Sequence, residues 1–144
     1  SQLLRSWYVA AFQIPRLPEV LLRRRNWRAL TRALVSTSRP GTFTESDLET
    51  CRRAWSEPGA IRAMLDWYRA GVRYRPDPRM DPRVRVPTLV IWGTRDRFLA
   101  PGLAESSASV CAQARVERID SATHWVQHEE PECVNRLLID FLAT

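Results

Sequence analysis

Two segments of the chain are predicted to form β-strands, and their small number constrains the fold more than any other feature. Val86 to Trp92 is a nearly unbroken apolar run rich in β-branched residues, and Ala114 to Ile119 is a second candidate strand. The first is typical of a strand covered on both faces of a parallel sheet. With helices over 102–111 and 131–142, these segments predict a right-handed strand-helix-strand-helix unit. Two parallel strands cannot bury both of their own faces, and the backbone groups at their outer edges have no hydrogen-bond partners. We therefore expect most of the sheet to lie in an N-terminal half outside this sequence.

The first 75 residues show helical spacing instead of strand spacing. Apolar residues recur every three or four positions, Thr44 to Asp47 has the pattern of a capping box, and Pro58 to Ala60 has the pattern of a helix start. Four residues after that start fall on one helical face: Ile61, Met64, Leu65 and Tyr68. We predict a helical cap over 1–75, a linker rich in proline and arginine over 76–85, and a core segment over 86–144.

The distribution of charge and the positions of the cysteines argue against a nucleic-acid partner, a metal site and a disulfide framework. The net charge of +6 comes from arginine alone, because the sequence has no lysine, and arginines occur in nearly every segment. We therefore expect no nucleic-acid partner, which would need a clustered basic face, and interpret Arg23 to Arg25 as a solvated turn. Cys51, Cys111 and Cys133 form no CxxC pair, so we expect neither a metal site nor a disulfide framework. Nothing in the sequence indicates a cofactor.

No segment has the length of a membrane span or the layout of a secretion signal. The apolar run that ends at Trp92 is far shorter than the roughly 20 residues that cross a bilayer. The opening residues alternate apolar side chains with arginines, unlike a signal peptide. We therefore expect no membrane partner and a cytoplasmic location.

A carboxylate and a histidine follow the two predicted strands at the point where each strand ends. Asp96 follows the first strand, and His124 follows the second, 28 residues later. The carboxyl ends of parallel strands meet at one edge of a sheet, and a crossover of about this length returns the chain to that edge. We therefore expect the Asp96 carboxylate within hydrogen-bond reach of the His124 imidazole, an arrangement that makes histidine a general base. The alternative for Asp96 is a cap of the following turn.

Four segments resemble motifs of the α/β hydrolases, specifically of the branch that contains epoxide hydrolases and related dehalogenases. Val86 to Asp96 resembles the family's acid loop, and Ala122 to Pro131 resembles its histidine loop. Ser6 to Glu19 resembles the start of the family's cap, and the Trp-Tyr-Arg sequence of 67–69 resembles the signature near the end of the cap. The resemblance spans essentially the whole chain. It implies an α/β fold in which a helical cap precedes the C-terminal part of an α/β-hydrolase core.

The resemblance also implies a mechanism with an ester intermediate. In the family an aspartate on a sharp strand-to-helix turn attacks an electrophilic carbon, and an activated water then hydrolyses the ester. His124 would activate that water, and Asp96 would orient His124. The 144 residues contain no Gly-x-Asp-x-Gly or Gly-x-Ser-x-Gly turn for such a nucleophile. We therefore expect an enzyme of the epoxide-hydrolase type with a small apolar substrate, and expect this chain to be inactive without the N-terminal half as its partner.

The residues that the resemblance places near the substrate are aromatic. Tyr68 would hydrogen-bond the epoxide oxygen and stabilise the alkoxide, although its helical position also suits a core tyrosine. The family's second cap tyrosine usually comes just before a Phe-Gln pair; here Ala10 and Ala11 stand there, and Tyr8 is the nearest phenol. Either Tyr8 replaces it from one helical turn away, or one tyrosine suffices, or the substrate is not an epoxide. The tryptophans that could line an apolar substrate pocket are Trp7, Trp67 and Trp125.

Two other functions fit the same residues. A haloalkane or haloacetate dehalogenase would share the nucleophile and the histidine base but would hold a halide with tryptophan or histidine donors. No histidine stands at the start of the cap, where Trp7 and Tyr8 occur, and this favours epoxides. A non-catalytic truncated fragment would account for the missing nucleophile turn. His128, beside two glutamates, is expected to be a surface residue.

Overall fold

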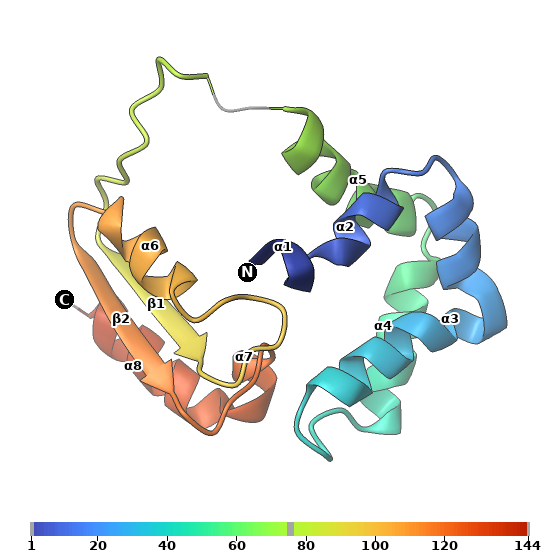
Figure 1. Cartoon of the computed structure of the whole chain (residues 1–144). Helices are drawn as coiled ribbons and strands as arrows, with labels where there is room; N and C mark the ends of the chain where they lie inside the picture. The colour runs from blue at the N-terminus through green and yellow to red at the C-terminus, as the bar shows by residue number, and fades with distance from the viewer. Residues whose placement is uncertain (1, 75–76, 144) are drawn as a thin grey trace.

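The computed structural model describes residues 2–74, which we name the cap, and residues 77–143, which contain most of the predicted linker and the core segment (Figure 1). The cap holds α1 (Gln2–Arg5), α2 (Trp7–Phe12), α3 (Leu17–Thr37), α4 (Glu45–Ser56) and α5 (Ala60–Arg73). The core segment holds β1 (Thr88–Gly93), α6 (Leu103–Ser109), β2 (Ala114–Ile119), α7 (Val126–Glu129) and α8 (Pro131–Leu142). In these two described ranges no helix is long and apolar enough to cross a membrane.

A small apolar core between α3, α4 and α5 holds the cap together. Trp27, Ile61 and Leu65 are buried in it. The ring of Trp55 packs on Trp27 with 6.1 Å between their centroids. Ile61 and Leu65 lie on one face of α5 because they are four residues apart. Burying a side chain of this size stabilises the fold by roughly 2 to 3 kcal/mol.

The two helix starts that the sequence predicts have different outcomes. Thr44 caps α4 as predicted: its Oγ1 accepts the Asp47 N–H at 3.2 Å, and the Asp47 carboxylate accepts the Thr44 N–H at 2.8 Å. α5, in contrast, begins at Ala60, after the predicted Pro58. The reason is Gly59, which has a φ of +83°, a left-handed conformation that cannot continue as a helix.

α3 is bent in its middle. Residues 25–27 have positive φ values between 52° and 62°, so the helix turns a corner there. Trp27 holds the corner, because its ring is buried and its Nε1 donates to Ser56 Oγ at 2.9 Å. The bend divides α3 into a first arm, 17–23, and a second arm, 28–37.

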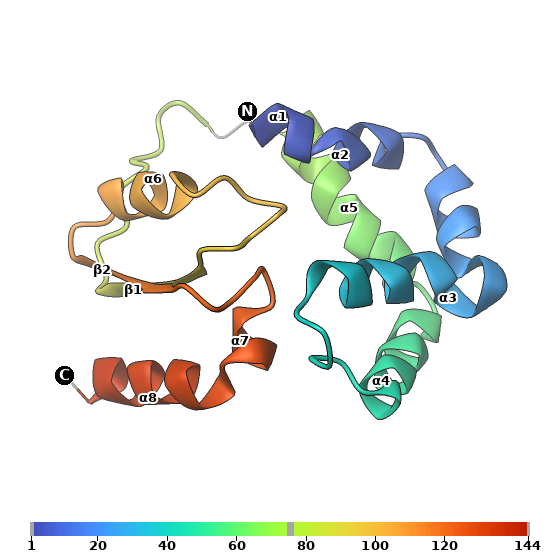
Figure 2. The same cartoon turned by 60° about the horizontal axis from the view of Figure 1, so that its bottom comes forward.

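The sheet is the parallel crossover unit that the sequence predicts. β1 and β2 pair in parallel in a register that runs from Thr88 opposite Ala114 to Gly93 opposite Ile119. α6 lies on one face of the two strands and α8 on the other (Figure 2). β1 begins two residues later than predicted, because Pro87 has no N–H to donate to the ladder.

α8 has the predicted bounds but is covered only in part. Val134 is buried, whereas Leu138, which the helical spacing places inward, is 41% exposed. Ile139 and Leu142 are exposed as well. The cause is the width of the sheet, because two strands cannot cover the whole apolar face of a helix.

Gly93 provides a test of how closely β1 packs on the loop that leads to His124. A Cβ atom at Gly93 would lie 2.7 Å from the carbonyl oxygen of Ala122 and would also collide with that of Thr123. We expect Gly93→Ala to destabilise the protein by about 3 kcal/mol or more in urea unfolding, because backbone atoms cannot move aside as a flexible side chain can. Gly71→Ala in α5, where a Cβ has free space, should instead stabilise it by up to about 1 kcal/mol. Equal effects of the two substitutions would show that this packing is loose.

Candidate active site

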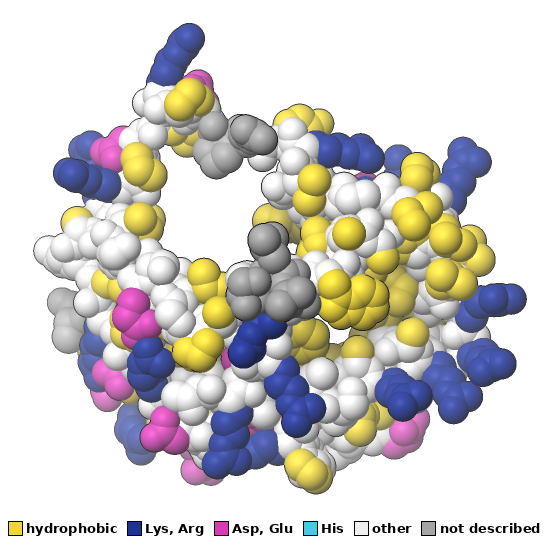
Figure 3. All heavy atoms as spheres, viewed as in Figure 1, with side chains coloured by type: hydrophobic (Ala, Val, Ile, Leu, Met, Phe, Trp, Pro, Cys, Tyr) yellow, Lys and Arg dark blue, Asp and Glu magenta, His cyan; other side chains and the backbone are white. Residues whose placement is uncertain are grey.

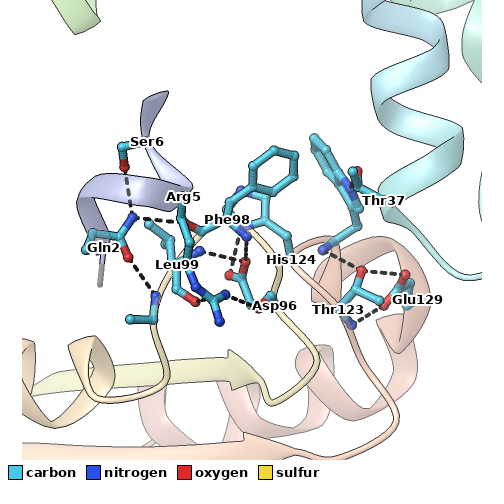
Figure 4. Close-up of polar contacts among 12 residues, drawn as sticks. Gln2, Arg5, Ser6, Thr37, Asp96, Phe98, Leu99, Thr123, His124 and Glu129 are labelled. Atoms are coloured by element: carbon cyan, nitrogen blue, oxygen red, sulfur yellow. Dashed lines mark hydrogen bonds and ion pairs between the residues drawn. The ribbon is translucent and has the colours of Figure 1, made fainter. Parts of the chain in front are cut away.

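The structure brings Asp96 and His124 together at the carboxyl edge of the sheet. His124 Nδ1 lies 2.8 Å from Asp96 Oδ2 (Figure 4). The Asp96 side chain is 7% exposed, and its Oδ1 accepts the backbone N–H groups of Phe98 at 2.7 Å and Leu99 at 2.9 Å. Asp96 therefore does both things that the sequence allowed: one oxygen caps its own loop, and the other meets the imidazole. A carboxylate at Nδ1 favours the tautomer whose Nε2 can accept a proton.

Two aromatic rings hold the imidazole from its sides. The centroid of the Phe98 ring lies 5.0 Å from that of the His124 imidazole. The centroid of the Trp125 ring lies 5.2 Å from it, and the plane of Trp125 is nearly perpendicular to the imidazole. Edge-to-face contacts of this kind restrict rotation of the imidazole. The imidazole is still one-third exposed, so a reactant can reach it.

A buried glutamate that no sequence motif indicated, Glu129, anchors the loop before His124. Glu129 is 7% exposed, and its carboxylate accepts the Thr123 N–H at 2.6 Å and the Thr123 hydroxyl at 2.8 Å. It also accepts the backbone N–H of Arg39, in the cap, at 2.7 Å. Burial opposes its ionisation, but the hydrogen bonds from Thr123 and Arg39 outweigh burial and hold the pKa of Glu129 below its usual value. Its neighbour His128 is exposed, in agreement with the expectation.

The cap contacts both loops of the site. On the acid loop, Gln2 Nε2 donates to the Phe98 carbonyl at 2.9 Å, and Arg5 donates to the Asp96 carbonyl at 3.0 Å (Figure 4). On the histidine loop, Trp125 Nε1 donates to Thr37 Oγ1 at 2.9 Å. The predicted substrate-binding residue Trp125 therefore also joins cap and core segment.

Two of the phenols of the cap meet on the side that faces Asp96. The rings of Tyr8 and Tyr68 are 5.9 Å apart, and Tyr8 lies 6.3 Å from Phe98, the ring that touches His124. Burial raises the pKa of the Tyr8 phenol, and the nearby Tyr68 and Asp96 raise it further. Tyr8 therefore keeps its proton well above neutral pH.

Arg69 fixes the tyrosines relative to one another. It is buried, and it donates to the Phe12 carbonyl at 2.9 Å and to Glu19 Oε1 at 2.7 Å. These bonds tie α5 to the end of α2, so Tyr68 is held against the helix that carries Tyr8. In the Trp-Tyr-Arg signature at 67–69, Arg69 therefore has a structural role and Tyr68 supplies the phenol.

The remaining predicted substrate-binding tryptophans lie on the surface. Trp67 is 82% exposed, on the face of α5 opposite Ile61 and Leu65, and Trp7 is 71% exposed with an edge contact to Tyr8. Helical spacing alone could not tell which face of each helix is buried. The structure therefore gives no support to Trp67 as a pocket residue. Among the described residues no three His, Cys, Asp or Glu side chains are arranged to hold a metal ion.

The anchoring role of Glu129 can be tested by substitution. We expect Glu129→Gln to lower the free energy of unfolding by about 1 to 3 kcal/mol, because the amide NH₂ cannot accept and leaves a buried donor unpaired. Glu132→Gln, at an exposed carboxylate in α8, should change it by less than about 0.5 kcal/mol. Urea unfolding at neutral pH measures both.

The same substitution should change the pH dependence of stability. The pKa of Glu129 is lowered in the folded protein, so its ionised form stabilises the fold above the ordinary glutamate pKa of about 4.3. That contribution disappears as the pH falls through the lowered value. The stability difference between wild type and Glu129→Gln should therefore shrink in acid. A difference that stays constant down to acid pH would contradict the role given to the carboxylate.

Comparison with known sequences matches most of the chain to one family. The sequence model of the alpha/beta hydrolase fold matches residues 7–131. The chain is 39% identical over 141 residues to the AB hydrolase superfamily protein YfhM of Bacillus subtilis (strain 168), a match that covers 98% of this chain and 49% of that protein. It is 32% identical over 143 residues to Epoxide hydrolase 2 of Caenorhabditis elegans, covering 96% of this chain and 40% of that protein.

Comparison with solved structures agrees. A crystal structure of Bacillus megaterium epoxide hydrolase in complex with an inhibitor matches with a TM-score of 0.80 and 26% identity, covering 99% of this chain and 53% of that one. The chain thus spans about half the length, or less, of the proteins it matches. The matched range includes both strands, both loops of the site and most of the cap, and it follows that this chain belongs to the α/β-hydrolase fold family, among its epoxide-hydrolase-like members.

Proposed function

We propose that this chain supplies the cap and the acid–histidine pair of an enzyme that opens epoxides. The observation that carries the proposal is the position of two phenols, Tyr8 and Tyr68, on the cap side of Asp96 and His124. Epoxide opening needs a proton donor for the ring oxygen, and hydrolysis of an ester needs a base for water. The arrangement offers a group for each step. Relatives named epoxide hydrolases support the proposal.

In the first step a carboxylate nucleophile attacks one carbon of the epoxide. The carbon–oxygen bond of the ring breaks, and its electron pair stays on the oxygen. Tyr8 and Tyr68 donate hydrogen bonds to this oxygen, and one of them gives it a proton. The product of the step is a hydroxyalkyl ester of the nucleophile. The nucleophile belongs to the part of the enzyme outside these 144 residues, so this chain by itself turns over no epoxide.

In the second step water attacks the carbonyl carbon of the ester. His124 Nε2 takes a proton from the water, and Asp96 stabilises the imidazolium through Nδ1. The bond between the carbonyl carbon and the alkyl oxygen then breaks, and the second proton of the water passes to that oxygen, which releases a diol and restores the carboxylate. The proton on His124 returns to the tyrosine that lost one, so the cycle closes without a further reactant.

The contacts favour an epoxide over a haloalkane. A dehalogenase needs indole N–H or imidazole donors for the leaving halide. In this chain Trp125 Nε1 already donates to Thr37, and Trp7 is largely exposed. The two phenols are instead suited to an alkoxide. Tyr8 therefore serves as the second cap tyrosine from one helical turn before the Phe12–Gln13 pair.

The histidine step can be tested in the complete protein. We expect His124→Gln to react once with an epoxide and then stop, because the ester forms without the base but is not hydrolysed. Intact-protein mass spectrometry should show a gain equal to the mass of one epoxide. His128→Gln, at the exposed histidine, should turn over like wild type and show no adduct. The absence of an adduct in His124→Gln would remove the ester mechanism.

The phenol step calls for a different measurement. We expect Tyr68→Phe to slow ester formation by roughly a hundredfold while ester hydrolysis changes little, because the phenol acts on the oxygen that leaves in the first step. Rapid-quench kinetics separate the two rates. Tyr74→Phe, at an exposed phenol just after α5, is the matched control. If the rate of ester hydrolysis fell in Tyr68→Phe and the rate of ester formation did not, the assignment of Tyr68 to the first step would be wrong.

A further inference from the structure

Positive charge is concentrated at the start of the chain. Residues 1–44 hold eight arginines and one glutamate, a net charge of +7, whereas residues 45–144 hold fourteen arginines and fifteen acidic residues, a net charge of −1. The arginines occur in nearly every segment, but acidic residues balance their charge over 45–144 taken together and not over 1–44. The expectation of no membrane partner rested on the lack of a segment long enough to cross a bilayer, and that lack does not bear on binding at a bilayer surface.

The arginines of this part also lack partners. Six of them are exposed, and their side chains make no hydrogen bond or ion pair to any residue of 2–74 or 77–143; they are Arg16, Arg23, Arg24, Arg25, Arg28 and Arg32. The one acidic residue nearby, Glu19, is bonded to Arg69 on the inner side of the helix. The outer side of α3 therefore carries uncompensated charge.

Aliphatic side chains lie among these arginines. Leu17, Val20 and Leu21 are spaced three and four residues apart, so they share one face of the first arm of α3, and all three are exposed. Arg24 follows at the end of this arm, where the bend begins, and Arg16 and Arg23 lie beside the three aliphatic residues in the sequence. We name these six residues the α3 face. Figure 3 shows hydrophobic side chains gathered over this arm with basic side chains at their margin.

The α3 face also has a shallow apolar hollow. A space of about 150 Å³ opens between α2 and the first arm of α3, and Phe12, Leu17 and Leu21 are among its lining residues. Its lining is almost wholly apolar. An aliphatic group could enter it while the surrounding arginines stay in water.

We propose that the α3 face binds the surface of an anionic phospholipid bilayer. A helix face that combines exposed aliphatic residues with unpaired arginines lies at the boundary between headgroups and acyl chains, where the arginines meet lipid phosphates. The hollow would take part of one acyl chain. The association is peripheral and does not depend on the hydrolase activity proposed above.

The exposed side chains favour a bilayer over a nucleic acid, the other polyanion that arginines could bind. Nucleic-acid surfaces place aromatic rings between their basic residues so that bases can stack on them. On the α3 face the apolar residues are aliphatic, and the one aromatic residue of α3, Trp27, is buried. Aliphatic side chains gain little from phosphate and sugar but much from lipid.

The test is cosedimentation of the complete protein with vesicles. We expect binding to phosphatidylcholine vesicles that contain about one-third phosphatidylglycerol, and at least tenfold weaker binding to phosphatidylcholine alone, because each basic residue near an anionic surface contributes about fivefold. The triple variant R16Q/R23Q/R24Q should lose roughly a hundredfold in affinity. R79Q/R83Q/R136Q removes the same charge from exposed sites outside the cap, two in the linker and one in α8, and should bind like wild type.

A second variant separates the aliphatic contribution from charge. Leu21→Ser keeps every arginine and should weaken binding to the anionic vesicles several-fold without changing its salt dependence. Circular dichroism confirms that each variant is folded. Equal binding to both vesicle types, equal losses in the two triple variants, or binding of a DNA oligonucleotide in place of vesicles would each overturn the proposal.

Discussion

The parallel pairing of β1 with β2 is the contact on which the candidate site depends. It brings the ends of both strands to one edge of the sheet, and hydrogen bonds continue beyond the strands: Thr94 N–H donates to the Ile119 carbonyl at 3.2 Å, and Arg95 N–H donates to the Ala122 carbonyl at 3.0 Å. The acid loop and the histidine loop are thus joined through their backbones before any side chain takes part. The short distance between Asp96 and His124 follows from this pairing.

Two buried carboxylates then hold the loops with different partners. Burying a carboxylate is costly unless hydrogen bonds replace water around it. Asp96 has two backbone N–H groups and an imidazole, and Glu129 has Thr123 and the backbone of Arg39. Asp96 acts within one loop and across to the next, whereas Glu129 reaches 90 residues back to the cap. The histidine loop is therefore positioned by the core segment and the cap together.

The parts of this arrangement that could be predicted from sequence are those with a local pattern. β1 follows from its apolar run, α8 from its periodicity, and the Asp96–His124 contact from the length of one crossover. Glu129 had no such pattern, because in the sequence Gln-His-Glu-Glu a buried carboxylate and a partly exposed one look alike, and one of its partners, Arg39, lies 90 residues away in the sequence. The exposure of Trp67 had the same cause: helical spacing identifies a face, but the neighbouring helices decide which face is covered.

One ion pair, between Arg69 and Glu19, affects both the side of the cap that faces the site and the outer side of α3. Arg69 binds Glu19 at 2.7 Å and the Phe12 carbonyl at 2.9 Å, and so it holds Tyr68 against the helix of Tyr8 on the side of the site. Glu19 is also the single acidic residue among the first 44. Because Arg69 occupies it from the inner side, no carboxylate remains to balance the arginines on the outer side of α3. The contact that orients the tyrosines therefore also leaves the opposite surface of the cap positively charged.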